Sequence, residues 1–155
     1  MATAAAFAAA APPAAQAQGS GSLIFNGLIP DACILLITTP GVLAPNATNT
    51  ELSSQETGGS PALATLTTTS TNFEVQVDPA SAFSVEPTGG GTNVSFSVDY
   101  SLAGVTILSD ILAGVGSPLG FGITFATVDA AAIKSSGAFP AGAYQLQTTI
   151  RCVSS

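Results

Sequence analysis

The chain has 155 residues, with nine acidic side chains, two basic ones and no histidine, so its net charge is −7 at neutral pH. Nucleic acids are bound through basic patches, so this charge argues against a nucleic-acid partner, and it disfavours anionic membrane surfaces for the same reason. Without histidine the chain has no Ser-His-Asp or Cys-His constellation, and two distant cysteines do not make a zinc site.

Only 7% of the residues are charged, against about 25% in an ordinary soluble domain. Surface polarity must therefore come from Thr, Ser, Asn and Gln, which suit the exposed faces of strands. A surface so poor in charge has little repulsion to keep copies apart, and this indicates assembly.

The first 17 residues differ in composition from the rest. Met1 to Ala17 is nearly all alanine and ends in Ala15-Gln16-Ala17, the small-x-small pattern of a signal-peptidase site. We expect a signal peptide over residues 1–17, export from the cell, and one mature domain over residues 18–155. The alternative is an unstructured Ala/Pro leader, because no Lys or Arg forms a basic n-region. No later run reaches 18 apolar residues, so we expect no transmembrane segment.

From residue 21 onward, apolar residues recur at period two between turns rich in Gly, Pro and Asn. Turn signals roughly every 8–12 residues, without a sustained helical period, predict an all-β, immunoglobulin-like antiparallel β-sandwich. Residues 32–39 are apolar on both faces, which predicts a strand in the middle of the sandwich. We expect seven or eight strands among residues 21–29, 32–39, 62–69, 72–78, 83–85, 94–100, 104–112, 121–125 and 141–152, with loops over 44–61 and 130–140.

The last of these strands ends at one of the two cysteines. One face carries Tyr144, Leu146, Thr148, Ile150 and Cys152 at period two, and the other face is polar. In an exported chain, Cys33 and Cys152 most simply form a disulfide between the first and last strands, although two buried free thiols are the alternative. Closing so long a loop would stabilise the fold by about 4–5 kcal/mol in the chain-entropy model.

No group of residues predicts catalysis or a cofactor. Glu74 and Asp78 are expected on the solvent side of their strand, so they do not suggest a paired-carboxylate hydrolase. Asp99, Asp110 and Asp129 are too dispersed in the sequence to argue for a calcium site. We therefore expect no enzyme activity and no metal, and we expect Arg151 to pair with a carboxylate on a neighbouring strand.

Both ends of the domain resemble a known family. The opening Gly21-Ser22-Leu23-Ile24-Phe25-Asn26-Gly27-Leu28-Ile29-Pro30-Asp31-Ala32-Cys33 and the ending Phe139-Pro140-Ala141-Gly142-Ala143-Tyr144 are similar to those of bacterial chaperone–usher pilins, including their spore-coat protein U branch. The resemblance implies a sandwich that lacks one strand and is completed by an N-terminal donor strand from another subunit. It also implies a periplasmic chaperone, an outer-membrane usher and passage through the periplasm to a surface fibre.

The resulting hypothesis is a secreted structural subunit of a pilus or coat, which assembles with copies of itself or related subunits by strand exchange. The exchange interface would comprise Leu23, Phe25, Gly27, Ile29, Tyr144, Leu146 and Ile150. Either residues 21–29 are the donor, or this subunit accepts a strand without giving one.

The alternative function is a self-complete secreted adhesin or carbohydrate-binding module. A disulfide between the first and last strands, which would lie on either side of the missing strand, is compatible with this alternative. However, the chain has no Trp and only Tyr100 and Tyr144 as tyrosines, which leaves no obvious platform for stacking a sugar.

Overall fold

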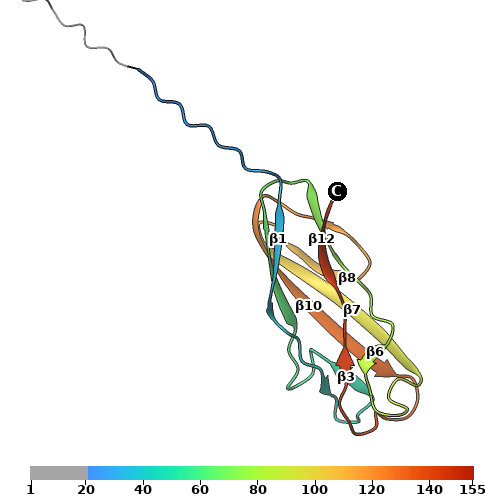
Figure 1. Cartoon of the computed structure of the whole chain (residues 1–155). Helices are drawn as coiled ribbons and strands as arrows, with labels where there is room; N and C mark the ends of the chain where they lie inside the picture. Colours follow the sequence, from blue (N-terminus) through green and yellow to red (C-terminus); the bar gives the residue numbers. More distant parts are fainter. Residues whose placement is uncertain (1–20) are drawn as a thin grey trace, which may run out of the picture.

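The structure, a computed structural model, describes residues 21–155, so the expected signal peptide of residues 1–17 lies outside the described residues (Figure 1). The described part is all-β and contains no helix. Its strands are β1 (Cys33–Thr39), β2 (Ala44–Pro45), β3 (Glu51–Ser53), β4 (Ala62–Thr68), β5 (Phe73–Val77), β6 (Phe83–Val85), β7 (Val94–Gly104), β8 (Leu108–Leu112), β9 (Ser117–Pro118), β10 (Gly122–Lys134), β11 (Gln145–Leu146) and β12 (Ile150–Ser154).

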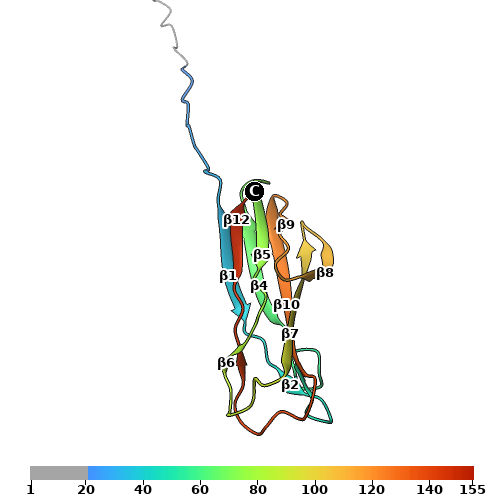
Figure 2. The ribbon, with the colours of Figure 1, turned by 90° about the vertical axis from the view of Figure 1, so that its right-hand side faces the viewer.

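The strands form a two-layered antiparallel sandwich (Figure 2). The larger layer is built around β10, which pairs with β7 along one edge and with β4 and then β3 along the other. Beyond these strands, β1 pairs with β4, β2 with β3, and β8 with β7. The smaller layer contains β12, β5 and β9, and is continued by the pair β11 and β6.

The main core lies between the two layers. Leu66 of β4 and Tyr100 of β7 pack against Val75 and Val77 of β5, and all four are fully buried. Burying such a side chain stabilises the fold by about 1.5–3 kcal/mol. The Tyr100 hydroxyl lies 2.7 Å from Ser117 Oγ and donates to the Val115 carbonyl at 2.7 Å, which satisfies its polar end.

A second, aromatic core fills the opposite end of the sandwich from the chain termini. Phe83 contacts Phe96 and Tyr144 edge to face, with ring centroids 5.0 Å apart in both pairs. Phe139 packs against the same cluster, and Lys134 lies over its ring, 5.3 Å from the centroid. The Lys134 ammonium also donates to the backbone carbonyls of Gly89 and Thr92, at 3.1 and 2.8 Å, so the contacts of this buried cation lie within the fold.

Most expected strands are confirmed within a few residues, but twelve segments replace the seven or eight expected. The expected last strand, residues 141–152, is divided into β11, which pairs with β6, and β12, which pairs with β5. The expected loop over 44–61 contains β2 and β3. The expected loop over 130–140 is wrong for its first part, because β10 continues through three alanines to Lys134 while paired with β7.

Two other expectations are wrong. Residues 21–29 form no strand, because no segment of the described chain lies beside them to accept their hydrogen bonds. The strand over residues 33–39 lies at a sheet edge and not in the middle, because β1 pairs with β4 alone.

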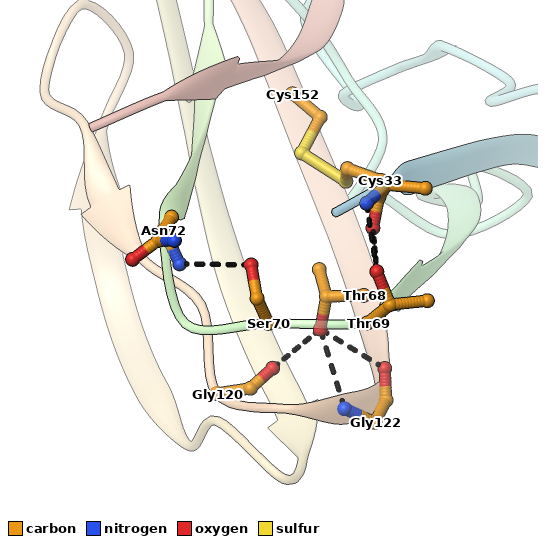
Figure 3. Close-up of a disulfide and its surroundings, with 9 residues drawn as sticks. Cys33, Thr68, Thr69, Ser70, Asn72, Gly120, Gly122 and Cys152 are labelled. Atoms are coloured by element: carbon orange, nitrogen blue, oxygen red, sulfur yellow. Dashed lines mark hydrogen bonds between the residues drawn. A yellow bond between two sulfur atoms is a disulfide. The ribbon is translucent and has the colours of Figure 1, made fainter. Parts of the chain in front are cut away.

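A buried hydroxyl in β10 has no partner. Thr124 is 1% exposed and its Oγ1 makes no hydrogen bond, whereas Oγ1 of the equally buried Thr68 donates to the Gly120 carbonyl at 2.6 Å and accepts from the Gly122 amide at 3.2 Å (Figure 3). Replacing an unpaired hydroxyl by a methyl group removes a desolvation cost without changing the shape.

We therefore expect Thr124→Val to raise the free energy of unfolding by about 1 kcal/mol, and Thr68→Val to lower it by about 2 kcal/mol because two backbone groups lose their partner. Denaturant unfolding of the oxidised protein measures both. A loss of stability in Thr124→Val as large as that in Thr68→Val would show that the Thr124 hydroxyl is hydrogen-bonded.

Asp99 of β7 lies directly opposite Asp129 of β10. Partial burial, and then the negative charges of Asp129 and Asp110, raise the pKa of Asp99 above its ordinary value. The ionised carboxylate therefore destabilises the fold at neutral pH, and the penalty is relieved as pH falls through the raised folded-state pKa toward the unfolded value.

Asp99→Asn should accordingly increase stability at pH 7, with a gain that shrinks as the pH is lowered into the acid range. Thermal melts across the pH series give the difference. Asp31→Asn, which removes the same charge from an exposed carboxylate two residues before β1, controls for the general relief of net charge. An equal gain there would contradict the local explanation.

Candidate functional site: a groove between two unpaired strand edges

Two strand edges face each other along one side of the sandwich. Within residues 21–155, β1 pairs only with β4 and β12 pairs only with β5, so each has one edge without a hydrogen-bonded neighbour. Both views place these strands side by side, with β1 running away from the end at which β12 finishes (Figures 1 and 2). The two edges are therefore antiparallel, and they belong to different layers.

A disulfide ties the edges together at one end of this seam. Cys33, the first residue of β1, is bonded to Cys152 of β12, with Cα atoms 6.4 Å apart (Figure 3). This separation is ordinary for a disulfide. The expected bond between the first and last strands is confirmed, and it closes one end of the seam covalently where no ladder of hydrogen bonds does so.

Beyond the disulfide, toward the far end of β1, the seam is hollow and its floor is the main core. A cavity of about 180 Å³ lies between Ile37 of β1 and Ile150 of β12, with buried Val77 and Val128 at its base. Ile37 follows Cys33 and Leu35 at period two and so points inward, yet it is 53% exposed. An inward-facing isoleucine remains open here because no strand lies between β1 and β12.

Further along, the seam widens into a larger hollow of about 570 Å³. Its walls are the segment leading into β2 on one side and residues 139–146 on the other, including Leu43, Leu52, Phe139, Tyr144 and Leu146. The Tyr144 hydroxyl donates to the Pro140 carbonyl at 2.8 Å. Burial, and then the charge of Glu86, raise the pKa of Tyr144, so its hydroxyl stays protonated and uncharged at neutral pH.

Outside the sandwich, residues 21–29 form an apolar tail. It extends away from the body at the end where the disulfide lies (Figure 1). Its large side chains are 79–91% exposed, and they are Leu23, Ile24, Phe25, Leu28 and Ile29. Both faces of an extended strand made from this segment would therefore be apolar.

The base of the tail is held firmly. The Thr69 hydroxyl donates to the Pro30 carbonyl at 2.9 Å and accepts from the Ala32 amide at 2.7 Å. Asp31 accepts a further bond from the Asn72 side chain at 2.9 Å. The tail thus leaves the body at a fixed place, immediately before Cys33.

The residues expected to form an exchange interface separate into two groups. Tyr144, Leu146 and Ile150 line the two hollows, whereas Leu23, Phe25, Gly27 and Ile29 lie in the tail and do not enter the groove of their own chain. Their role in strand exchange stays a prediction. Sequence reasoning missed Ile37 and Phe139 as groove residues; the apolar character of both faces of residues 33–39 was the signal for the first.

Other sequence-predicted residues are placed as follows. Arg151 pairs with Asp78 at 2.5 Å, as expected. Tyr100 is fully buried and so offers no surface to a sugar. Asp99 and Asp129 come together although they are distant in sequence, but among residues 21–155 no group of three or more His, Cys, Asp or Glu side chains is arranged to hold a metal ion.

The described chain also contains no helix of the length and apolar character required to cross a membrane. No protein-family model matches the sequence, and no curated protein is significantly similar to it.

Proposed function

We propose that this protein is an exported structural subunit of an extracellular fibre or coat, and that copies join by strand exchange. In this proposal the tail of one copy, residues 21–29, fills the groove between β1 and β12 of the next. The observation that carries the proposal is the coexistence, in one chain, of an apolar groove with unpaired edges and an exposed apolar tail.

The tail is long enough for the seam. At about 3.3 Å per residue, nine extended residues span about 30 Å. β1, from Cys33 to Thr39, spans about 23 Å at the same rise, and the larger hollow begins directly beyond it at Gly41. One tail therefore suffices to fill the seam.

The disulfide and the position of the tail favour one direction of insertion. Because β1 and β12 are antiparallel, a strand between them is parallel to one and antiparallel to the other. The disulfide and the copy's own tail occupy one end of the seam, so a neighbour's tail enters from the other end, with its first residues toward the disulfide. That strand runs parallel to β1 and antiparallel to β12.

This geometry generates an open chain. Each copy accepts a strand at one end of its groove and presents its own tail beyond the opposite, disulfide end, so the contact is heterologous and copies are added in one direction. The product is a linear, head-to-tail fibre.

The energetics favour exchange through several side chains together. Burying Leu23, Phe25 and Ile29 from near-complete exposure contributes roughly 1.5–3 kcal/mol each. Association costs at least about 4 kcal/mol, so no single side chain is enough, and the backbone hydrogen bonds to β1 and β12 add the remaining affinity.

Before assembly, an open apolar edge invites aggregation. A periplasmic chaperone that covers the groove and an outer-membrane usher that orders the exchange are therefore the partners that we propose, in line with the pilin-like ends of the sequence.

A charged residue on the inserted face of the tail tests the proposal. We expect the oxidised protein, isolated after export, to form concentration-dependent linear oligomers, seen by light scattering and electron microscopy. Phe25→Asp should abolish them, because it places a carboxylate in an apolar groove. Asn26→Asp, which adds the same charge on the opposite face of the tail, should leave them largely intact.

Deleting residues 21–29 provides the second arm, because these residues make no strand and lie outside the sandwich. The shortened chain should be monomeric and should bind a synthetic peptide of residues 21–29, but not the peptide with Phe25→Asp. A full-length protein that stays monomeric and melts cooperatively, or oligomers that survive the deletion, would refute strand exchange and favour a self-complete binding module.

A further inference from the structure

The outer face of the larger layer carries a second apolar surface, separate from the groove. Ile34 and Leu36 of β1 and Ile123 and Phe125 of β10 lie in two adjacent rows, because Ile34 pairs through Thr67 with Ile123, and Leu36 pairs through Thr65 with Phe125. These four side chains are 49–64% exposed. We call them, with Thr65 and Thr67, the apolar half-face.

In β10 the usual size pattern of a half-buried strand is reversed. Its inward residues in this stretch are the small Thr124 and Ala126, whereas Ile123 and Phe125 point away from the core. The sequence therefore places its larger apolar side chains on the solvent side of a central strand. Packing within one copy does not explain this arrangement, and a large exposed apolar patch indicates an interface.

The other half of the same outer face is acidic. Asp129 lies four residues beyond Phe125 and so shares its side of β10, and Asp99 pairs directly with it. Ile123 and Phe125, by contrast, pair with Thr67 and Thr65 on one side and have Val105 and Ala103 on the other, so no charged side chain lies beside them. The face thus divides into an apolar half and an acidic half.

We propose that the apolar half-face packs against the apolar half-face of a second copy, related by a two-fold axis that lies in the plane of the contact and runs across the strands. Such a contact is isologous, so one flat patch serves both partners. The two-fold arrangement also sends the two acidic halves in opposite directions, whereas a parallel arrangement would stack the Asp99 and Asp129 pairs on each other.

This lateral contact stands without strand exchange, but within a fibre it becomes larger, and that extension rests on the proposed function. With Leu23, Phe25 and Ile29 in the groove, the opposite face of the tail carries the apolar side chains Ile24 and Leu28. They would lie beside β1, next to Ile34 and Leu36. A small contact is weak alone, but many copies along two antiparallel fibres add their contributions.

Sedimentation equilibrium of the full-length oxidised protein tests the contact. Excess synthetic peptide of residues 21–29 is added to occupy the groove, so that lateral pairing is measured without head-to-tail growth. We expect a monomer–dimer equilibrium that added salt does not weaken, because the contact is apolar and contains no ion pair for salt to screen. The double variant Ile123→Thr/Phe125→Thr should weaken the dimer by about tenfold or more.

Ile133→Thr is the matched control, because Ile133 is also on the outer side of β10 and 44% exposed but lies outside the apolar half-face. It should leave the dimer unchanged, and Thr suits a strand, so all variants should keep their melting transitions. In electron micrographs, the fibres of the double variant should separate into single threads while their length is unaffected.

An unchanged dimer in the double variant, or a monomer at every concentration, would overturn the lateral contact. Fibres that stay bundled in the double variant would do the same. If Phe25→Asp abolished all association while Ile123→Thr/Phe125→Thr had no effect, the lateral contact would also be overturned, and strand exchange would be supported. Conversely, a dimer that depends on Ile123 and Phe125 in a protein that never forms fibres would support the lateral contact and refute the proposed function.

Discussion

The structure depends on a pair of backbone edges that have no neighbour. Each unpaired edge of β1 and β12 presents amide and carbonyl groups that must find partners in water or in another strand. The side chains beside them, such as Ile37, point inward yet remain open because the place next to them is empty. The seam therefore has both unpaired backbone groups and incompletely buried apolar side chains. One additional strand between β1 and β12 would pair the former and bury the latter.

The disulfide explains how such a seam persists in a folded chain. Two edges in different layers, with no ladder between them, are free to spread or to collapse onto each other. The bond between Cys33 and Cys152 fixes their spacing at one end, and the aromatic cluster of Phe83, Phe139 and Tyr144 supports the other end. The groove therefore lies between a covalently closed end and an end that is supported by packed aromatic rings.

The sequence predicted the parts of this fold in which one face of a strand is buried. The alternation in β4, β5 and β7 identifies their strands, and the position of the two cysteines identifies the disulfide. Period two shows which residues share a face but not which face is inward, so the alternation could not show that Ile123 and Phe125 point outward. The edge position of β1 could not be predicted either. A strand that is apolar on both faces has the same sequence pattern whether it has one hydrogen-bonded neighbouring strand or two.

The anchoring of the tail determines how stiff an assembled fibre would be. Thr69 bonds to both Pro30 and Ala32, so almost no free chain remains between the sandwich and the segment that leaves it at residue 29. A linker this short and this constrained transmits torque from one copy to the next. In a strand-exchanged fibre, neighbouring sandwiches would be set at a nearly constant angle, and the thread would bend as an elastic rod and not as a string of beads.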